Sequence, residues 1–224
     1  MTLYKTNKQA LLFRNNAPEF LNGLTSNSMD RPRNAFLSIH GKIIATFDQL
    51  KIDDETVLIC IEKLYVPETL KHLDRYVKLS GVKVEQLPHH VYFDLAGDYA
   101  VGKDEYSIAQ KKGQLVISNQ ALEARVSDDE FTQFRLNNAI PVHGIDYKDE
   151  FLLNVSTSDH VSFTKGCYLG QEPVSKVYNR SKPTWKLVVK QQEDSSEEEK
   201  GKMTSTVRDS KTGKARGFVF VKNV

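Results

Sequence analysis

The residues best suited to chemistry lie in one short segment, Lys165-Gly166-Cys167-Tyr168-Leu169-Gly170-Gln171-Glu172. A cysteine thiolate attacks electrophiles and binds metals, and a nearby cation such as Lys165 favours the thiolate over the thiol. The two glycines permit positive φ angles, so the backbone can bend sharply and approach a ligand or partner closely. We therefore predict that Cys167 is presented on a turn rather than packed in a core. Lys165 is then either its electrostatic activator or a surface lysine.

The other reactive side chains carry weaker signals. Cys60 stands in the apolar run Leu58-Ile59-Cys60-Ile61, which predicts a buried strand and core packing. The six histidines show no metal-ligand spacing, so we expect no metal site carried by this chain alone. His143 or His160 could serve as the base for a Cys167 nucleophile, which leaves a cysteine hydrolase as one alternative.

Composition narrows the class of protein. The chain has 224 residues, of which 39% are hydrophobic, enough to bury a core in one large or two smaller domains. The 31 basic and 29 acidic residues nearly balance, which argues against direct nucleic-acid binding. No run of about 18 apolar residues exists that would span a membrane. Two cysteines make no disulfide framework, so we expect a reducing, cytoplasmic setting.

The first half of the chain predicts an antiparallel unit of strands and helices. Asn16, Pro18 and Gly23 are suited to the start, first turn and end of a short helix. Residues 33–50 predict two strands joined at 40–42, and apolar or alternating runs predict further strands at 56–61 and 82–87. Apolar residues at helical spacing predict a helix over 67–79.

The second half changes character twice. Glycines between short apolar runs predict strands and tight turns over 90–118, and the spacing of Ser127 and Glu130 predicts a capping box before a helix that ends near Asn138. Residues 147–170 are expected to be extended, leading into the cysteine segment. Strands at 185–190, 203–208 and 215–222 predict a small barrel-like module, interrupted by an acidic run at 193–202 that we interpret as a solvated loop.

The cysteine segment, from Ser162 to Glu172, resembles the signature of the YgfZ family. These are folate-binding proteins of iron–sulfur cluster assembly and repair, similar in fold to the T-protein (aminomethyltransferase) of the glycine cleavage system. Further segments resemble the family in the same order: Phe20–Asn27, Ala35–Ile43, Phe134-Arg135 with Ala139-Ile140-Pro141 and Gly144-Ile145-Asp146, and, near the end, Met203–Ser205 and Gly217–Val219.

The resemblance implies an α+β, T-protein-like fold, with an antiparallel α/β folate-binding body at 1–175, shortened in its middle segment, and a β-barrel-like module at 176–224. It implies that tetrahydrofolate or a derivative binds where the body meets the cysteine segment, and that the partners are iron–sulfur enzymes or cluster assembly proteins. Cys167 would be the functional thiol. The folate contacts implied are Lys165, Gly166, Tyr168, Gly170, Gln171, Glu172, Arg135 and Asn27.

Several of these residues also have a structural interpretation. The amide of Gln171 and the carboxylate of Glu172 complement the donor–acceptor edge of a pterin, but they could equally begin a helix, and both can hold at once. Tyr168 could anchor the loop or contact the ligand. An arginine such as Arg135 is commonly salt-bridged, and Asn27 could be a turn residue.

The chain departs from the resemblance in two places. Leu152-Leu153-Asn154 stands where the family commonly has a proline–x–glutamate segment with a folate-contacting glutamate. Asparagine can form hydrogen bonds but does not carry the negative charge of glutamate. The T-protein's catalytic aspartate segment has no match over 61–73. A non-catalytic, folate-binding accessory protein is therefore the first interpretation, and aminomethyltransferase-like one-carbon transfer is the alternative.

Overall fold

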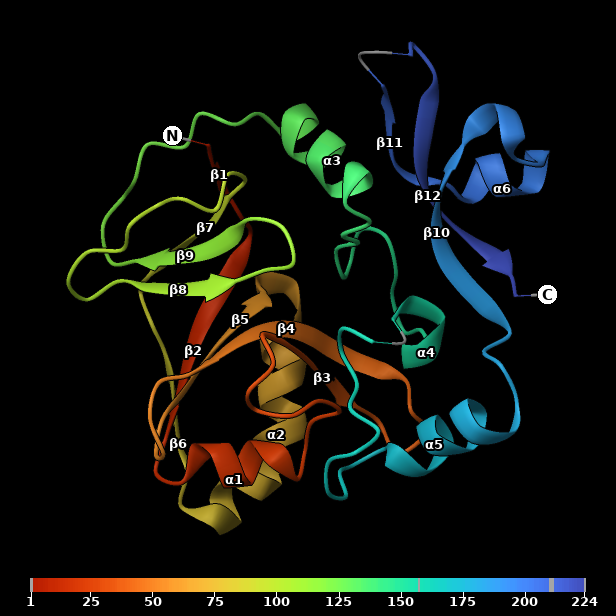
Figure 1. Cartoon of the computed structure of the whole chain (residues 1–224). Helices are drawn as coiled ribbons and strands as arrows, with labels where there is room; N and C mark the ends of the chain where they lie inside the picture. The colour runs from red at the N-terminus through yellow and green to blue at the C-terminus, as the bar shows by residue number, and fades with distance from the viewer. Residues whose placement is uncertain (1, 157, 210–211, 224) are drawn as a thin grey trace.

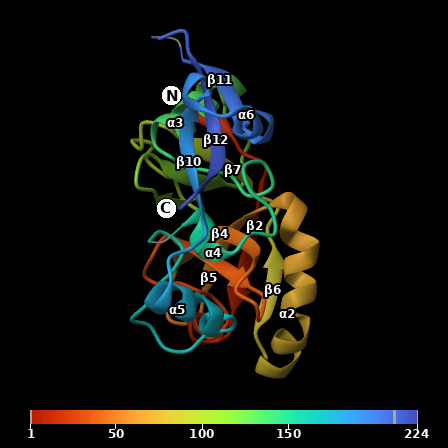
Figure 2. The same cartoon turned by 90° about the vertical axis from the view of Figure 1, so that its right-hand side faces the viewer.

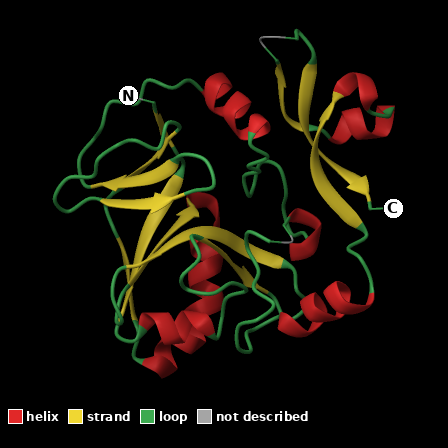
Figure 3. Ribbon diagram, viewed as in Figure 1, coloured by secondary structure: helices red, strands yellow, loops and turns green. Residues whose placement is uncertain are grey.

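The computed structural model describes residues 2–156, 158–209 and 212–223. Its strands form three antiparallel sheets, with the orders β3-β4-β5-β2-β6, β1-β7-β9-β8 and β10-β12-β11 (Figures 1 and 3). The strands are β1 Leu3–Lys5, β2 Lys8–Arg14, β3 Arg33–Leu37, β4 Ile43–Lys51, β5 Val57–Glu62, β6 Lys83–Gln86, β7 His90–Asp94, β8 Tyr106–Ala109, β9 Gln114–Ser118, β10 Trp185–Gln191, β11 Thr204–Arg208 and β12 Ala215–Lys222. The helices are α1 Ala17–Asn22, α2 Val66–Ser80, α3 Asp128–Asn137, α4 Leu152–Val155, α5 Gln171–Arg180 and α6 Glu197–Lys202, with 3-10 turns η1 Lys63–Tyr65 and η2 Gln192–Asp194.

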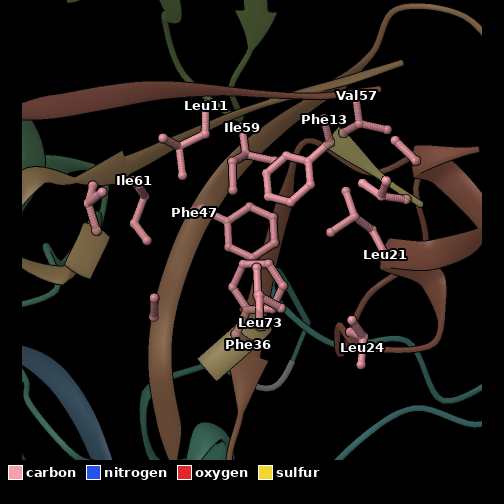
Figure 4. Packing of buried hydrophobic residues seen from close by; sticks show 14 of the residues in the cluster. Leu11, Phe13, Leu21, Leu24, Phe36, Phe47, Val57, Ile59, Ile61 and Leu73 are labelled. Atoms are coloured by element: carbon pink, nitrogen blue, oxygen red, sulfur yellow. The ribbon is translucent and has the colours of Figure 1, made fainter. Parts of the chain in front are cut away.

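The five-stranded sheet is buried on both faces, which explains the continuous apolar runs of β2 and β5. Successive side chains of a strand point to opposite faces. On one face, Leu11 and Phe13 of β2 join Ile59 of β5 in a core with α1 and α2 (Figure 4). On the other face, Leu12 and Cys60 pack toward the four-stranded sheet. The predicted burial of Cys60 is therefore confirmed.

Helix α2 covers the first of these faces (Figure 2). Val66 and Leu73 are buried against the sheet, as the helical spacing of the sequence predicts. The helix ends at Gly81, whose φ of +75° is the left-handed conformation that favours glycine. The predicted helix over 67–79 is confirmed, and so are the neighbouring strands β3 to β6.

Two helix starts follow the capping-box rule, and the sequence analysis identified one of them. The side chain of Ser127 accepts from the backbone N–H of Glu130 and starts α3, as predicted. Ser196 and Glu199 make the same reciprocal contacts at the start of α6. The expectation of a solvated loop over 193–202 is therefore wrong, because the acidic run contains its own helix-start signal.

The C-terminal strands form an open sheet rather than a barrel. β12 lies between β10 and β11, and the described part of the chain supplies no further strand to close it. Helix α6 packs on β12, and α3 packs on β11. Helix α5 spans 171–180 across the predicted boundary between residues 175 and 176, so that boundary stays a prediction.

Two local details differ from expectation. Asn16 precedes α1 in the left-handed conformation, with φ 57°, and its side chain donates to Glu19 rather than capping the helix, while Gly23 has an ordinary φ of −77°. The segment 147–170, expected to be extended, contains the single turn of α4. Among the described residues, none of the helices has the length and apolar character needed to cross a bilayer.

Candidate functional site

A cavity of about 400 Å³ lies on the face of the five-stranded sheet opposite α2. Its walls come from all three sheets, α3 and the segment 140–147. The lining residues are Tyr4, Thr6, Asn7, Lys8, Arg33, Thr46, Phe47, Asp48, Glu62, Phe93, Gln110, Leu115, Asp128, Phe131, Thr132, Arg135, Ile140, Pro141, Val142, His143, Ile145, Tyr147, His160 and Ser205.

Strand register explains why charged side chains meet in this cavity. Lys8 of β2 is directly opposite Glu62 of β5, and Arg33 of β3 is opposite Asp48 of β4. Such cross-strand pairs bring side chains together on one face of a sheet. The Lys8 ammonium lies 3.0 Å from Glu62 and 3.2 Å from Asp48. Burial acts to lower the pKa of Lys8, but the two carboxylates outweigh burial and raise it.

Arg135 is held on the cavity wall by a buried ion pair. Its guanidinium donates to the Asp146 carboxylate at 2.6 Å and to the Ser205 hydroxyl at 2.7 Å. The same carboxylate accepts from the Val142 N–H and the Thr204 hydroxyl. The cluster therefore joins α3, the 140–147 segment and β11 around one wall of the cavity.

Two histidines on the cavity wall are neutral at ordinary pH. Burial lowers the pKa of His143 to about 3 and that of His160 to about 3. The His143 ring is stacked between Tyr65 and Tyr147, with centroid distances of 3.6 and 5.0 Å. Cys167 does not line this cavity, so the cavity does not place its thiol next to His143 or His160.

Cys167 lies on the surface, as the sequence predicts. Of the two flanking glycines, Gly170 has a φ of +84°, and a Cβ at this position would lie 2.5 Å from the Ser38 carbonyl oxygen. Gly170 therefore provides both the bend and the close approach to the β3–β4 hairpin. Gly166 lies outside the positive-φ region and has open space around it, so only one glycine acts as expected.

Lys165 fastens the cysteine segment to the loop after α1. Its Nζ donates to the carbonyl oxygens of Asn22, Thr25 and Asn27, at 2.8, 2.7 and 2.9 Å. Burial lowers the pKa of Lys165 to about 8, while the three carbonyl oxygens favour the charged form. This contact joins two segments that the sequence analysis singled out separately. Activation of Cys167 by Lys165 stays a prediction.

The remaining predicted folate contacts lie around this junction. Tyr168 is buried beneath the loop. Gln171 and Glu172 form the first turn of α5, as one of the two interpretations expected. The Asn27 side chain donates to the Arg33 and Asp159 carbonyls, at 2.9 and 3.0 Å.

The lining of the central cavity includes only one of the eight predicted folate contacts, Arg135. The cavity therefore does not lie at the junction with Cys167, where the sequence analysis expected it. A folate-contacting role for the other seven residues stays a prediction.

The sequence analysis missed most of the cavity's polar lining. Lys8, Asp48, Glu62 and Gln110 were not singled out, and His143 and His160 were considered only as bases for Cys167. One signal existed for Asp48, because a carboxylate in the middle of the β4 run is uncommon in a buried strand unless it is paired. Gln110 carries no such signal.

Comparison with known proteins identifies the fold. No protein-family model matches the chain. The chain is similar to the crystal structure of glycine cleavage system aminomethyltransferase T from Bartonella henselae, with a TM-score of 0.74 and 12% sequence identity over 98% of this chain and 78% of that one. The predicted T-protein-like α+β fold is therefore confirmed, and the barrel-like character of the C-terminal module stays a prediction.

Proposed function

We propose that this protein binds a folate in the central cavity and supports iron–sulfur cluster assembly or repair through Cys167 on a separate surface. The observation that carries the proposal is a ligand-sized cavity inside a fold shared with aminomethyltransferase T. The resemblance of the cysteine segment to the YgfZ signature supports the second half of the proposal.

The cavity has the composition of a site for a flat, partly polar ligand. Its volume falls within the range of about 300–1,000 Å³ that is usual for small-molecule sites. Tyr4, Phe93 and Phe131 supply an aromatic wall, with the Tyr4 and Phe131 rings stacked at 4.0 Å. Hydrogen-bonding side chains lie across the sheet face. A pterin ring joined to an aminobenzoyl group uses both kinds of surface.

The position of Cys167 favours action on a macromolecular partner. The thiol is exposed, while Lys165 on one side of it contacts the loop after α1 and the bend at Gly170 on the other side lies against the β3–β4 hairpin. A rigid, exposed thiol can meet a partner's sulfur or metal without rearrangement of the loop.

Calorimetry with 5-formyl-tetrahydrofolate tests the first half, with saturable binding expected. Complementation of a strain that depends on the protein for its iron–sulfur enzymes tests the second. Cys167→Ala should lose that activity and retain folate binding. The proposal fails if no folate binding is measured and Cys167→Ala supports the enzymes as well as the unchanged protein.

Aminomethyl transfer is a second candidate, favoured by the carboxylates of Asp48 and Glu62 in the cavity. Such a carboxylate could hold the amine that the reaction transfers. Both are already engaged with Lys8, which argues against a free acidic group. Formation of methylene-tetrahydrofolate from an aminomethyl donor, lost in Asp48→Asn, would establish this activity.

A further inference from the structure

The charged side chains of the central cavity have ionic or hydrogen-bonding partners, whereas several of its neutral polar side chains have none. Three basic and three acidic residues line it, so its formal charge is balanced. Lys8 is paired with two carboxylates, and Arg135 is paired with Asp146. Arg33 donates to Gln110 and lies 3.7 Å from Asp48. The three cationic side chains of the wall are therefore each close to a carboxylate, while Asp128 accepts from the Tyr4 hydroxyl.

The unsatisfied groups are neutral. Both ring nitrogens of His143, Nδ1 of His160 and Nε2 of Gln110 are buried, and none has a hydrogen-bond partner among the described residues. An unsatisfied buried polar group costs about 1–3 kcal/mol, and native proteins keep few of them without a reason. Three such residues line one cavity, and a ligand bound there would complete their hydrogen bonds once a side-chain rotation turns the buried nitrogen toward it.

The chemistry of these groups limits the ligand. A neutral imidazole offers one donor and one acceptor, and an amide nitrogen offers two donors. Rotation of an imidazole about its Cβ–Cγ bond exchanges its nitrogen and carbon edges, so either edge can be turned to the cavity. An anionic ligand group would find each cation of the wall already close to a carboxylate and would have to be desolvated. The stack of Tyr65, His143 and Tyr147, with interplanar angles of 10° and 11°, holds one imidazole in a fixed plane.

We propose that His143, His160 and Gln110 recognise an uncharged, planar nitrogen heterocycle with alternating donors and acceptors on its edge. Its identity as the pterin half of a folate rests on the proposed function. The three residues would determine specificity for the ring, while the remainder of the ligand would lie along the aromatic wall.

Calorimetry with a whole ligand and its two halves separates these ideas. The probes are 5-formyl-tetrahydrofolate, 6-methyl-tetrahydropterin and p-aminobenzoylglutamate. His160→Phe and His143→Phe should each weaken binding of the first two about tenfold or more, because each loses a buried hydrogen bond. His160→Gln should retain part of the affinity, because an amide restores a donor and an acceptor. Binding of p-aminobenzoylglutamate should stay unchanged.

His72→Phe is the matched control. His72 also has a buried nitrogen without a partner, but it lies on α2 and does not line the cavity. Affinity should therefore stay within about twofold of the unchanged protein, since no contact with the ligand is lost. Thermal unfolding of each variant shows whether it is folded, and Gln110→Leu replaces His143→Phe if that variant does not fold.

Each outcome bears on the proposals separately. If the folate binds and the variants bind it as tightly as the unchanged protein, the recognition proposal is overturned and folate binding stands. If the folate does not bind, but 6-methyl-tetrahydropterin binds in a way that depends on His160, folate binding is overturned and the recognition proposal stands. If none of these probes binds, both are overturned. An equal loss of p-aminobenzoylglutamate binding in the variants would also overturn recognition of the ring.

Discussion

The central cavity and the cysteine segment both contain charged side chains, but these side chains have different partners in the two regions. The residues that line the cavity come from positions between Tyr4 and Ser205, and its cationic side chains form ion pairs with carboxylates. The cysteine segment is contiguous, and its one cation, the partly buried Lys165, donates to backbone carbonyl oxygens instead of a carboxylate. In the first region charge builds a neutral interior, and in the second it fixes the position of an exposed thiol.

This difference explains why the two regions can serve one protein without sharing a site. The proposed recognition of a small ring requires preorganised hydrogen-bonding groups, and polar side chains without partners line the cavity. Reaction of a thiol with a partner requires exposure, which Cys167 has. His160 and Cys167 are only seven positions apart, yet one lines the cavity and the other lies at the surface. A short stretch of chain therefore separates the two environments.

The largest effect is expected where the cavity wall depends on a buried ion pair. Asp146→Asn removes the charge that balances Arg135, whose side chain is only 4% exposed. Breaking a buried pair leaves an uncompensated charge, so the free energy of unfolding should fall by about 3–5 kcal/mol. Urea denaturation measures this change.

Asp74→Asn is the control for that experiment. Asp74 pairs with Lys78 on the outer surface of α2, where its side chain is 56% exposed. An exposed pair of this kind contributes about 0.2–1 kcal/mol. Equal losses in the two variants would contradict the view that the cavity wall depends on internal charge pairing.

A smaller and more local effect is expected at the cysteine segment. Lys165→Met keeps most of the aliphatic stem but removes the ammonium that donates to three carbonyl oxygens. Hydrogen bonds from a charged group contribute about 1.5–3 kcal/mol, so stability should fall by that amount. Hydrogen exchange should increase in residues 22–27 and 162–170, while the cavity wall stays protected.

Lys176→Met provides the comparison, because Lys176 is an exposed residue on the neighbouring helix α5. Its stability should change by less than about 0.5 kcal/mol, as is usual for surface substitutions. Faster exchange throughout the molecule in Lys165→Met would show that the loop is not a separate unit.

Much of the fold follows from the sequence, because its signals are local. The alternation and apolar runs of β3 to β6, the helical spacing of α2 and the capping box of Ser127 each act within a few residues, whereas the strand β2 was not predicted. The helix α6 was missed although Ser196 and Glu199 carry the same signal, since the acidic run suggested a solvated loop. The three C-terminal strands were predicted, but their arrangement as an open sheet could not be, because it depends on strand pairing between distant segments.

The candidate site divides in the same way. The exposure of Cys167 and the bend at Gly170 could be predicted from eight adjacent residues. The pairing of Lys8 with Asp48 and Glu62 could not, because it depends on the register of three strands. The partnerless state of His143 likewise depends on everything packed around it. Ordinary residue types acquire their role there only through tertiary packing.

The pH dependence of stability provides a third comparison. His143 and His160 have pKa values lowered to about 3 in the folded protein, from 6.5. The unfolded chain therefore takes up protons below pH 6.5 that the folded chain does not. Stability from each histidine is complete above pH 6.5 and is lost as the pH falls toward 3, by about 1.4 kcal/mol per pH unit.

Most of the charges near the two histidines also lower their pKa values. Besides burial, Lys8 lowers the pKa of both histidines and Arg33 lowers that of His160, while Asp159 opposes the shift. His160→Gln should remove the contribution of His160 and so reduce the slope of unfolding free energy between pH 6.5 and 4.5. His40→Gln removes a histidine at an exposed position and is the comparison variant for this measurement. A slope in His160→Gln identical to that of the unchanged protein would show that His160 does not stay neutral in the folded state.

The smallest effect on stability is expected at the residue proposed to matter most for function. Cys167→Ser changes an exposed side chain and should alter the free energy of unfolding by less than about 0.5 kcal/mol. Cys60→Ser places a hydroxyl in an apolar strand and should cost about 1–3 kcal/mol. In thiol labelling of the native protein, one equivalent should react quickly and disappear in Cys167→Ser, because the second thiol becomes accessible only on unfolding. Rapid labelling of two thiols, or a large loss of stability in Cys167→Ser, would mean that the cysteine segment is part of the packed interior.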